Sequence, residues 1–179
     1  MEAPATPART RVPAGPLRPW LLPLCRGFEL VAMATLVVAT SAIMVEVVAR
    51  GVFALGLPGA GELARFAGLA LIFLTVPLLL AHDAHVKVDM FSSRASGLPR
   101  RLLDVCNELA TLSFCVLFLL ACWWFMQRAA RFSTPALEIP NIVYYAPAIA
   151  GMVLTTLVAF DRVLGLITGR QSLPEEVRP

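Results

Sequence analysis

The residues of this sequence best suited to chemistry are two histidines with two aspartates nearby. They lie in AHDAHVKVDMF, residues 81–91, which contains His82, Asp83, His85 and Asp89. Side chains three positions apart share one face of a helix, so the two histidines could bind one metal ion with a carboxylate beside them. This segment directly follows a long apolar run, so its interpretation depends on where that run lies.

The composition predicts a membrane protein. Hydrophobic residues make up 58% of the chain and charged residues 15%, whereas soluble domains are about 25% charged. Four apolar runs approach the roughly 20 residues that cross a bilayer, and they cover residues 28–49, 63–81, 105–126 and 142–167. Because lipid offers no hydrogen-bonding partners to the backbone, each run should be a continuous helix. We therefore predict an all-α integral membrane protein with a four-helix membrane domain over residues 27–168.

The segments outside the spans differ in character. Residues 1–26 are rich in proline and arginine, so we expect an extended or disordered tail there, and residues 169–179 form a second short tail. Residues 82–104, between the second and third spans, mix arginines with apolar side chains. This mixture predicts an amphipathic segment lying in the membrane interface. Gly97 and Pro99 should limit it to short helical stretches.

The distribution of positive charge predicts the orientation of the chain. Of its fifteen Lys and Arg residues, only Arg50, Arg65, Arg128 and Arg131 would face outward if the N-terminus is inside. Positive charge is retained on the cytoplasmic side, so both termini should be cytoplasmic. The net charge of +3 then reflects orientation and contact with anionic lipid headgroups. We predict no binding of nucleic acid.

Several polar or small residues lie in or beside the spans. Glu46 and Arg50 are four positions apart and predict an ion pair at the outer end of the first span; proton or coupling-ion handling is the alternative. Glu62 opens the second span, where a carboxylate favours the positive end of the helix dipole, and Arg65 can extend outward. Gly68 belongs to a series of small residues that permits close helix approach and could contact a partner.

Other features predict structure rather than chemistry. The four cysteines show no CxxC spacing, which indicates core residues rather than a metal site. Asn141 follows Pro140 where the fourth helix should begin, as a plausible cap. Asp161 and Arg162, near the end of the last span, indicate a polar stop at the inner membrane surface.

The order of these features resembles the small membrane subunit of tripartite ATP-independent periplasmic (TRAP) transporters, over roughly residues 26–168. The matching positions are Arg50, Glu62, His82, His85 and Asp89 around the second span, and Ser133, Pro140 and Pro147 before and within the fourth. The sequence departs from the family where a tryptophan and a pair of acids often precede the second span, since only Glu62 stands there. It also has His82 where Arg or Lys is common.

The resemblance implies a scaffold rather than an enzyme. Such a subunit has no catalytic, cofactor-binding or metal-binding residues. It holds a large, many-span permease that takes up carboxylate-type solutes with sodium, delivered by a periplasmic solute-binding protein, in the bacterial inner membrane. Candidates for structural or subunit-interface roles are Glu46, Arg50, Glu62, Arg65, Gly68, His82, His85, Asp89, Ser133 and Pro140. Two alternatives stay open: a membrane electron-transfer or metal-binding subunit that uses His82 and His85, or an unrelated four-span assembly protein.

Overall fold

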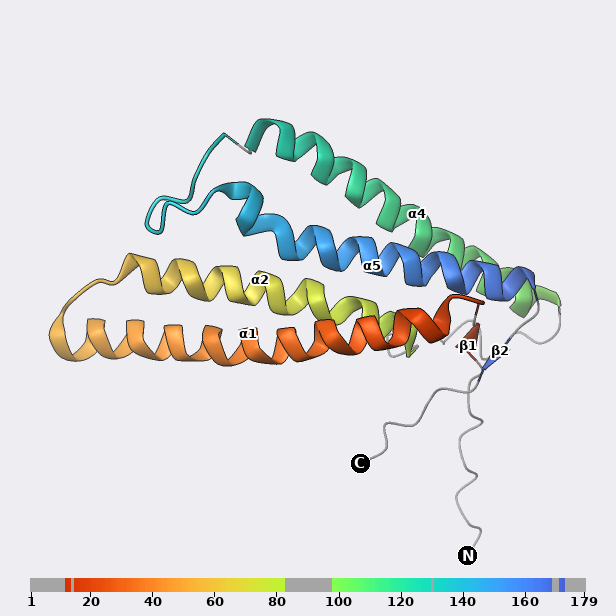
Figure 1. Cartoon of the computed structure of the whole chain (residues 1–179), viewed down its shortest axis with the longest axis horizontal. Helices are drawn as coiled ribbons and strands as arrows, with labels where there is room; N and C mark the ends of the chain where they lie inside the picture. Colours follow the sequence, from red (N-terminus) through yellow and green to blue (C-terminus); the bar gives the residue numbers. More distant parts are fainter. Residues whose placement is uncertain (1–11, 14, 83–97, 130, 169–170, 173–179) are drawn as a thin grey trace, which may run out of the picture.

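The computed structural model describes residues 12–13, 15–82, 98–129, 131–168 and 171–172 (Figure 1). Its helices are α1 (Arg18–Phe53), α2 (Pro58–Ala81), α4 (Leu98–Ala129) and α5 (Asn141–Ile167). Its strands are the two-residue β1 (Val12–Pro13) and β2 (Gln171–Ser172). Within the described residues, four helices are long and apolar enough to cross a membrane, which confirms the predicted number of spans.

The helices lie side by side in one row, in the order α1, α2, α5, α4 (Figure 1). Each helix packs mainly on its neighbour in this row, and α1 also touches α5. The most apolar stretch is therefore only 17% buried in α1 and 6% in α4, at the two edges, against 39% in α5. This open arrangement leaves much apolar surface, above all on α1 and α4, for lipid or a protein partner.

The two ends of this row differ, and we name them by what they contain. The loop end holds residues 54–57, between α1 and α2, and residues 131–140, between α4 and α5. The termini end holds the start of α1 and the two strands, which pair antiparallel so that Val12 lies opposite Ser172. The first and last described residues of the chain are therefore neighbours.

Helices α1, α2 and α4 each begin at least five residues before the predicted apolar runs. Residues 18–26, expected to be extended, form the first turns of α1. Residues 98–104 belong to α4 instead of forming short interfacial helices. Pro99 is accommodated because the first turn of a helix has no use for its missing backbone donor. The remainder of the predicted interfacial segment, residues 83–97, lies outside the described residues.

The connection between α1 and α2 is shorter than predicted. Helix α1 ends where Ala54 adopts the left-handed conformation, with φ 54°. The backbone N–H of Leu55 then donates to the carbonyl oxygen of Ala49 at 3.1 Å, which closes the helix end. Pro58, which lies between the first two predicted spans, starts α2, since its fixed φ suits the first helical position.

Small residues bring the helices close together. The buried face of α1 presents alanines at helical spacing, and α2 presents two more: Ala32, Ala39, Ala42, Ala67 and Ala70. In lipid, helices associate through close packing rather than through the hydrophobic effect, and small side chains permit it. The helices approach closely at Gly151 of α5, where an added Cβ would lie 2.1 Å from the backbone oxygen of Phe73. At this point α5 and α2 meet backbone to backbone.

The cysteines are free thiols in different environments. Cys25 and Cys115 are buried, Cys122 is half-buried and Cys106 is exposed. The prediction that they are core residues is thus correct for the first two and wrong for Cys106.

Candidate functional site

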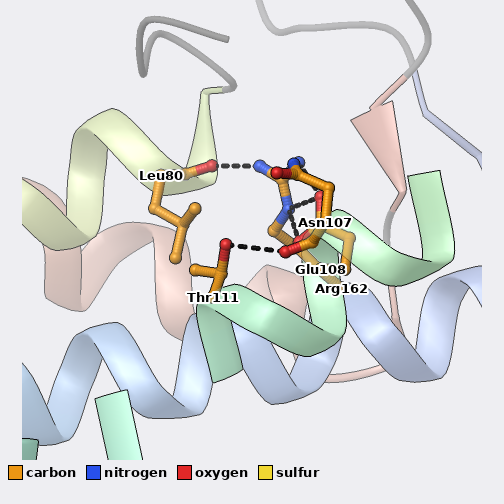
Figure 2. Close-up of polar contacts among 5 residues, drawn as sticks. All are labelled: Leu80, Asn107, Glu108, Thr111 and Arg162. Carbon is orange, nitrogen blue, oxygen red and sulfur yellow. Dashed lines mark hydrogen bonds and ion pairs between the residues drawn. The ribbon is translucent and has the colours of Figure 1, made fainter. Parts of the chain in front are cut away.

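A buried ion pair joins α4 to α5 at the termini end. Arg162, near the end of α5, is 2% exposed, and Glu108 of α4 is 3% exposed. The Nε atom of Arg162 donates to both carboxylate oxygens of Glu108 at 3.0 Å, and Nη2 donates to Oε1 as well. Figure 2 shows the guanidinium and carboxylate groups facing each other between the helices. A multiply hydrogen-bonded Arg–carboxylate pair fixes orientation as well as distance.

The same arginine also reaches α2. Its Nη1 atom donates to the carbonyl oxygen of Leu80, in the last turn of that helix (Figure 2). Carbonyl groups in a last turn run out of partners within the helix, so a cationic donor there is favourable. On α4, the Thr111 hydroxyl donates to the carbonyl oxygen of Asn107 at 2.9 Å, one residue before Glu108. Arg162 therefore connects α2, α4 and α5.

Asp161, the residue before it, caps α1. Its Oδ1 atom accepts the backbone N–H of Leu17 at 2.8 Å, and Oδ2 accepts that of Gly15 at 3.0 Å. Helix α1 has no side-chain cap of its own, so a distant carboxylate performs this role. A Cβ on Gly15 would lie 2.3 Å from Asp161, so the contact requires glycine. Asp161 and Arg162, two adjacent residues of α5, thus connect all four helices. The sequence predicted only that they end the last span at the inner membrane surface.

The charges of this termini-end cluster (Asp161, Arg162 and Glu108) are well satisfied. Removing charged groups from water is costly unless each finds a partner of opposite charge or enough hydrogen bonds. In the described part of the chain, no buried side-chain nitrogen or oxygen lacks a hydrogen-bond partner. The cluster is therefore suited to fixing the arrangement of the helices.

At the loop end, Glu62 fixes the connection between α4 and α5. Its side chain is buried, and Oε2 accepts the backbone N–H groups of Ala136 and Leu137, both at 2.9 Å. Thr134 shapes the same connection, since its hydroxyl accepts the N–H of Ile139 at 3.0 Å. Glu62 was predicted to interact with the helix dipole of α2. It binds the backbone of a loop more than seventy residues away in sequence instead.

The predicted pair of Glu46 and Arg50 is confirmed. Nη2 of Arg50 donates to Oε1 of Glu46 at 3.0 Å, with the arginine side chain 72% exposed. The second carboxylate oxygen of Glu46 lies over Gly61 of α2, where an added Cβ would be 2.8 Å away. The absence of a side chain at Gly61, near the start of α2, thus makes room for the Glu46 carboxylate of α1. Arg65 is exposed, and its Nε donates to the carbonyl oxygen of Gly61 at 3.2 Å.

The other predicted site residues are not brought together. A Cβ on Gly68 would meet nothing within 4 Å, so this residue is open on the surface of the chain. The side chain of His82 is half-buried at the end of α2. The backbone N–H of His82 donates to the carbonyl oxygen of Leu78. His85 and Asp89 lie outside the described residues. Within the described ranges, no three His, Cys, Asp or Glu side chains are placed to hold a metal ion.

Ser133 and Pro140 delimit the α4–α5 connection. They form an isolated antiparallel bridge, and Pro140 stands directly before α5. The prediction that Asn141 caps the start of α5 is wrong, because its Nδ2 atom donates instead to the carbonyl oxygen of Ala129 at 3.2 Å. The side chain therefore stabilises the end of α4.

Sequence reasoning missed Glu108 altogether. A signal was available, because an acidic residue near the start of the third span requires a partner when it is buried in a membrane protein. Arg162 lies at a similar level along α5, the helix that runs antiparallel beside α4. Predicting Arg162 as the partner of Glu108 requires knowing that α4 packs against α5 and which faces of the two helices meet. The apolar pattern does not give this information.

Comparison with known protein families supports a specific assignment. A family model described as the DctQ component of tripartite ATP-independent periplasmic transporters matches residues 39–169. This match covers the last fifteen of the 36 residues of α1 and all of α2, α4 and α5. A comparison with curated proteins found no match.

Proposed function

We propose that this chain, which belongs to the DctQ component family of tripartite ATP-independent periplasmic transporters, is the small membrane subunit that scaffolds a large permease. The family assignment makes it a transporter component. The scaffolding role is our inference from the way its helices and charges are arranged.

The observation that carries this proposal is the single row of helices. A chain that binds and moves a solute by itself needs a polar site near the bilayer midplane, often beside interrupted helices. Here the helices are continuous, and the buried charges of the termini-end cluster bind one another and helix ends. The edge helices α1 and α4 leave most of their apolar surface uncovered. Such a shape suits a protein that lies against the side of a larger one.

We further propose the setting in which this subunit works. Its partners are a many-span permease and a periplasmic solute-binding protein, and the transported solutes are carboxylates moved with sodium. The membrane is the bacterial inner membrane, and the termini end is cytoplasmic. The excess of Lys and Arg in the segments assigned to that side supports this orientation.

The candidate residues have different proposed roles. Glu46 and Glu62, with Arg50 and Arg65 nearby, shape the loop end of this chain. Gly68 has open space over it and is a candidate contact for the permease. His85 and Asp89 remain proposed anchors at the end of the second span.

Co-expression tests the proposal directly. A large permease of the same transporter family should co-purify with this chain in mild detergent, and liposomes containing both should take up a carboxylate when a sodium gradient and the solute-binding protein are supplied. Liposomes with this chain alone should show no sodium-driven uptake. Uptake by the single chain, or a permease that is stable and fully active without it, would contradict a scaffolding role.

A further inference from the structure

The first turns of α1, residues 18–27, depend on contacts from elsewhere in the chain. They precede the apolar run, and Pro23 within them cannot donate a backbone hydrogen bond. A helical segment this short is marginal in water by itself. Its start is held by the Asp161 carboxylate through Gly15 and Leu17. The start of this segment is therefore tied to α5.

This segment covers the termini-end cluster. Cys25 of α1 is fully buried against Leu80 of α2 and against Leu154 and Val158 of α5. Beside it is a small pocket between these three helices, lined by Arg18, Leu21, Leu22, Ala81, Val158, Asp161 and Arg162. Because Arg162 contributes to the wall of this pocket, lifting the first turns of α1 would admit water to the buried ion pair.

We propose that residues 15–27 form a latch, locked by Asp161, that closes the termini end over the Arg162–Glu108 pair and opens as one unit. Local opening of a segment requires few cooperative contacts and an identifiable boundary. The capping contacts at Gly15 and Leu17 supply the lock. Pro23 removes a backbone hydrogen bond inside the segment, and Gly27, over which nothing packs within 4 Å, marks its boundary with the rest of α1. The proposal concerns the chain itself and does not depend on what the transporter carries.

A native thiol reports on the latch. Cys25 is inside the closed segment and fully buried, whereas Cys115 is buried between α4 and α5 and distant from it in sequence. The full-length chain in mild detergent is treated with N-ethylmaleimide, and modification at each cysteine is followed by mass spectrometry. In the Asp161→Ala variant, Cys25 should react about tenfold faster or more, given the strength of hydrogen bonds to a charged group. Cys115 should keep its rate.

Two further variants keep the test decisive. Gly15→Ala places a Cβ against Asp161 and should accelerate the reaction of Cys25 with every side chain of α5 unchanged. Glu62→Gln alters a buried carboxylate at the opposite end and should leave Cys25 unchanged. An unchanged Cys25 rate in both latch variants would overturn the proposal. Equal acceleration of Cys25 and Cys115 would also overturn it, because that result means general unfolding.

Discussion

Replacing Arg162 by methionine removes one partner of the buried pair and leaves the other in place. Met has similar length and is compatible with the apolar surroundings, so packing changes little. Glu108, at 3% exposure, is left without its cation. The carbonyl oxygen of Leu80 loses its donor in the same step.

The expected cost follows from these contacts. Removing one member of a buried ion pair typically costs about 3–5 kcal/mol because the remaining charge is uncompensated. Replacing both members by apolar residues is often close to neutral. We therefore expect Arg162→Met to lower the free energy of unfolding by about 4 kcal/mol. The double variant Arg162→Met with Glu108→Met should recover most of this loss, apart from the hydrogen bond to Leu80.

Unfolding in detergent measures the free energies of unfolding of the single and the double variants. The chain in mild detergent is titrated with sodium dodecyl sulfate, and helix content and the fluorescence of the tryptophans are followed for the parent, both single variants and the double variant. The four free energies form a double-mutant cycle. Additive effects of the two single variants, or a loss below about 1 kcal/mol for Arg162→Met, would refute our reasoning, since an exposed pair behaves that way.

The remaining predictions concern the other contacts. Glu62→Gln should weaken the hold on the α4–α5 connection and make it more sensitive to trypsin; an unchanged digestion rate would count against the proposed restraint. Gly151→Ala drives a Cβ into the backbone of Phe73 and should destabilise the chain by about 1–3 kcal/mol, measured by the same detergent titration. Gly68→Ala is its matched control and should leave stability unchanged or raise it by up to about 1 kcal/mol, because nothing lies within 4 Å and alanine favours a helix over glycine. Ala54→Gly relieves a left-handed conformation at φ 54° and should raise stability by about 1 kcal/mol; a loss would contradict that interpretation.

Local patterns account for what the sequence predicts correctly. Apolar runs locate the four spans because hydrocarbon thickness fixes the length of a crossing helix. The pair of Glu46 and Arg50 is predictable because both residues lie on one helix, one turn apart. Neither inference requires knowledge of which helices are neighbours.

Contacts distant in sequence account for the rest. The first turns of α1 are stabilised by Asp161, about 145 residues later in the sequence, so composition alone mistakes them for a disordered tail. Glu62 likewise binds the backbone of the α4–α5 connection rather than the end of its own helix, because the fold brings that distant segment to it. The row arrangement is also hidden, because helices that are apolar on every side do not indicate which faces meet protein and which meet lipid.

The pairing of Glu108 with Arg162 has a consequence for biosynthesis. A ribosome completes α4 before it has made α5, so for that interval a newly inserted chain holds a carboxylate near the membrane without its arginine. A copy of the chain in which α5 is missing or fails to insert keeps the Glu108 carboxylate without its arginine partner.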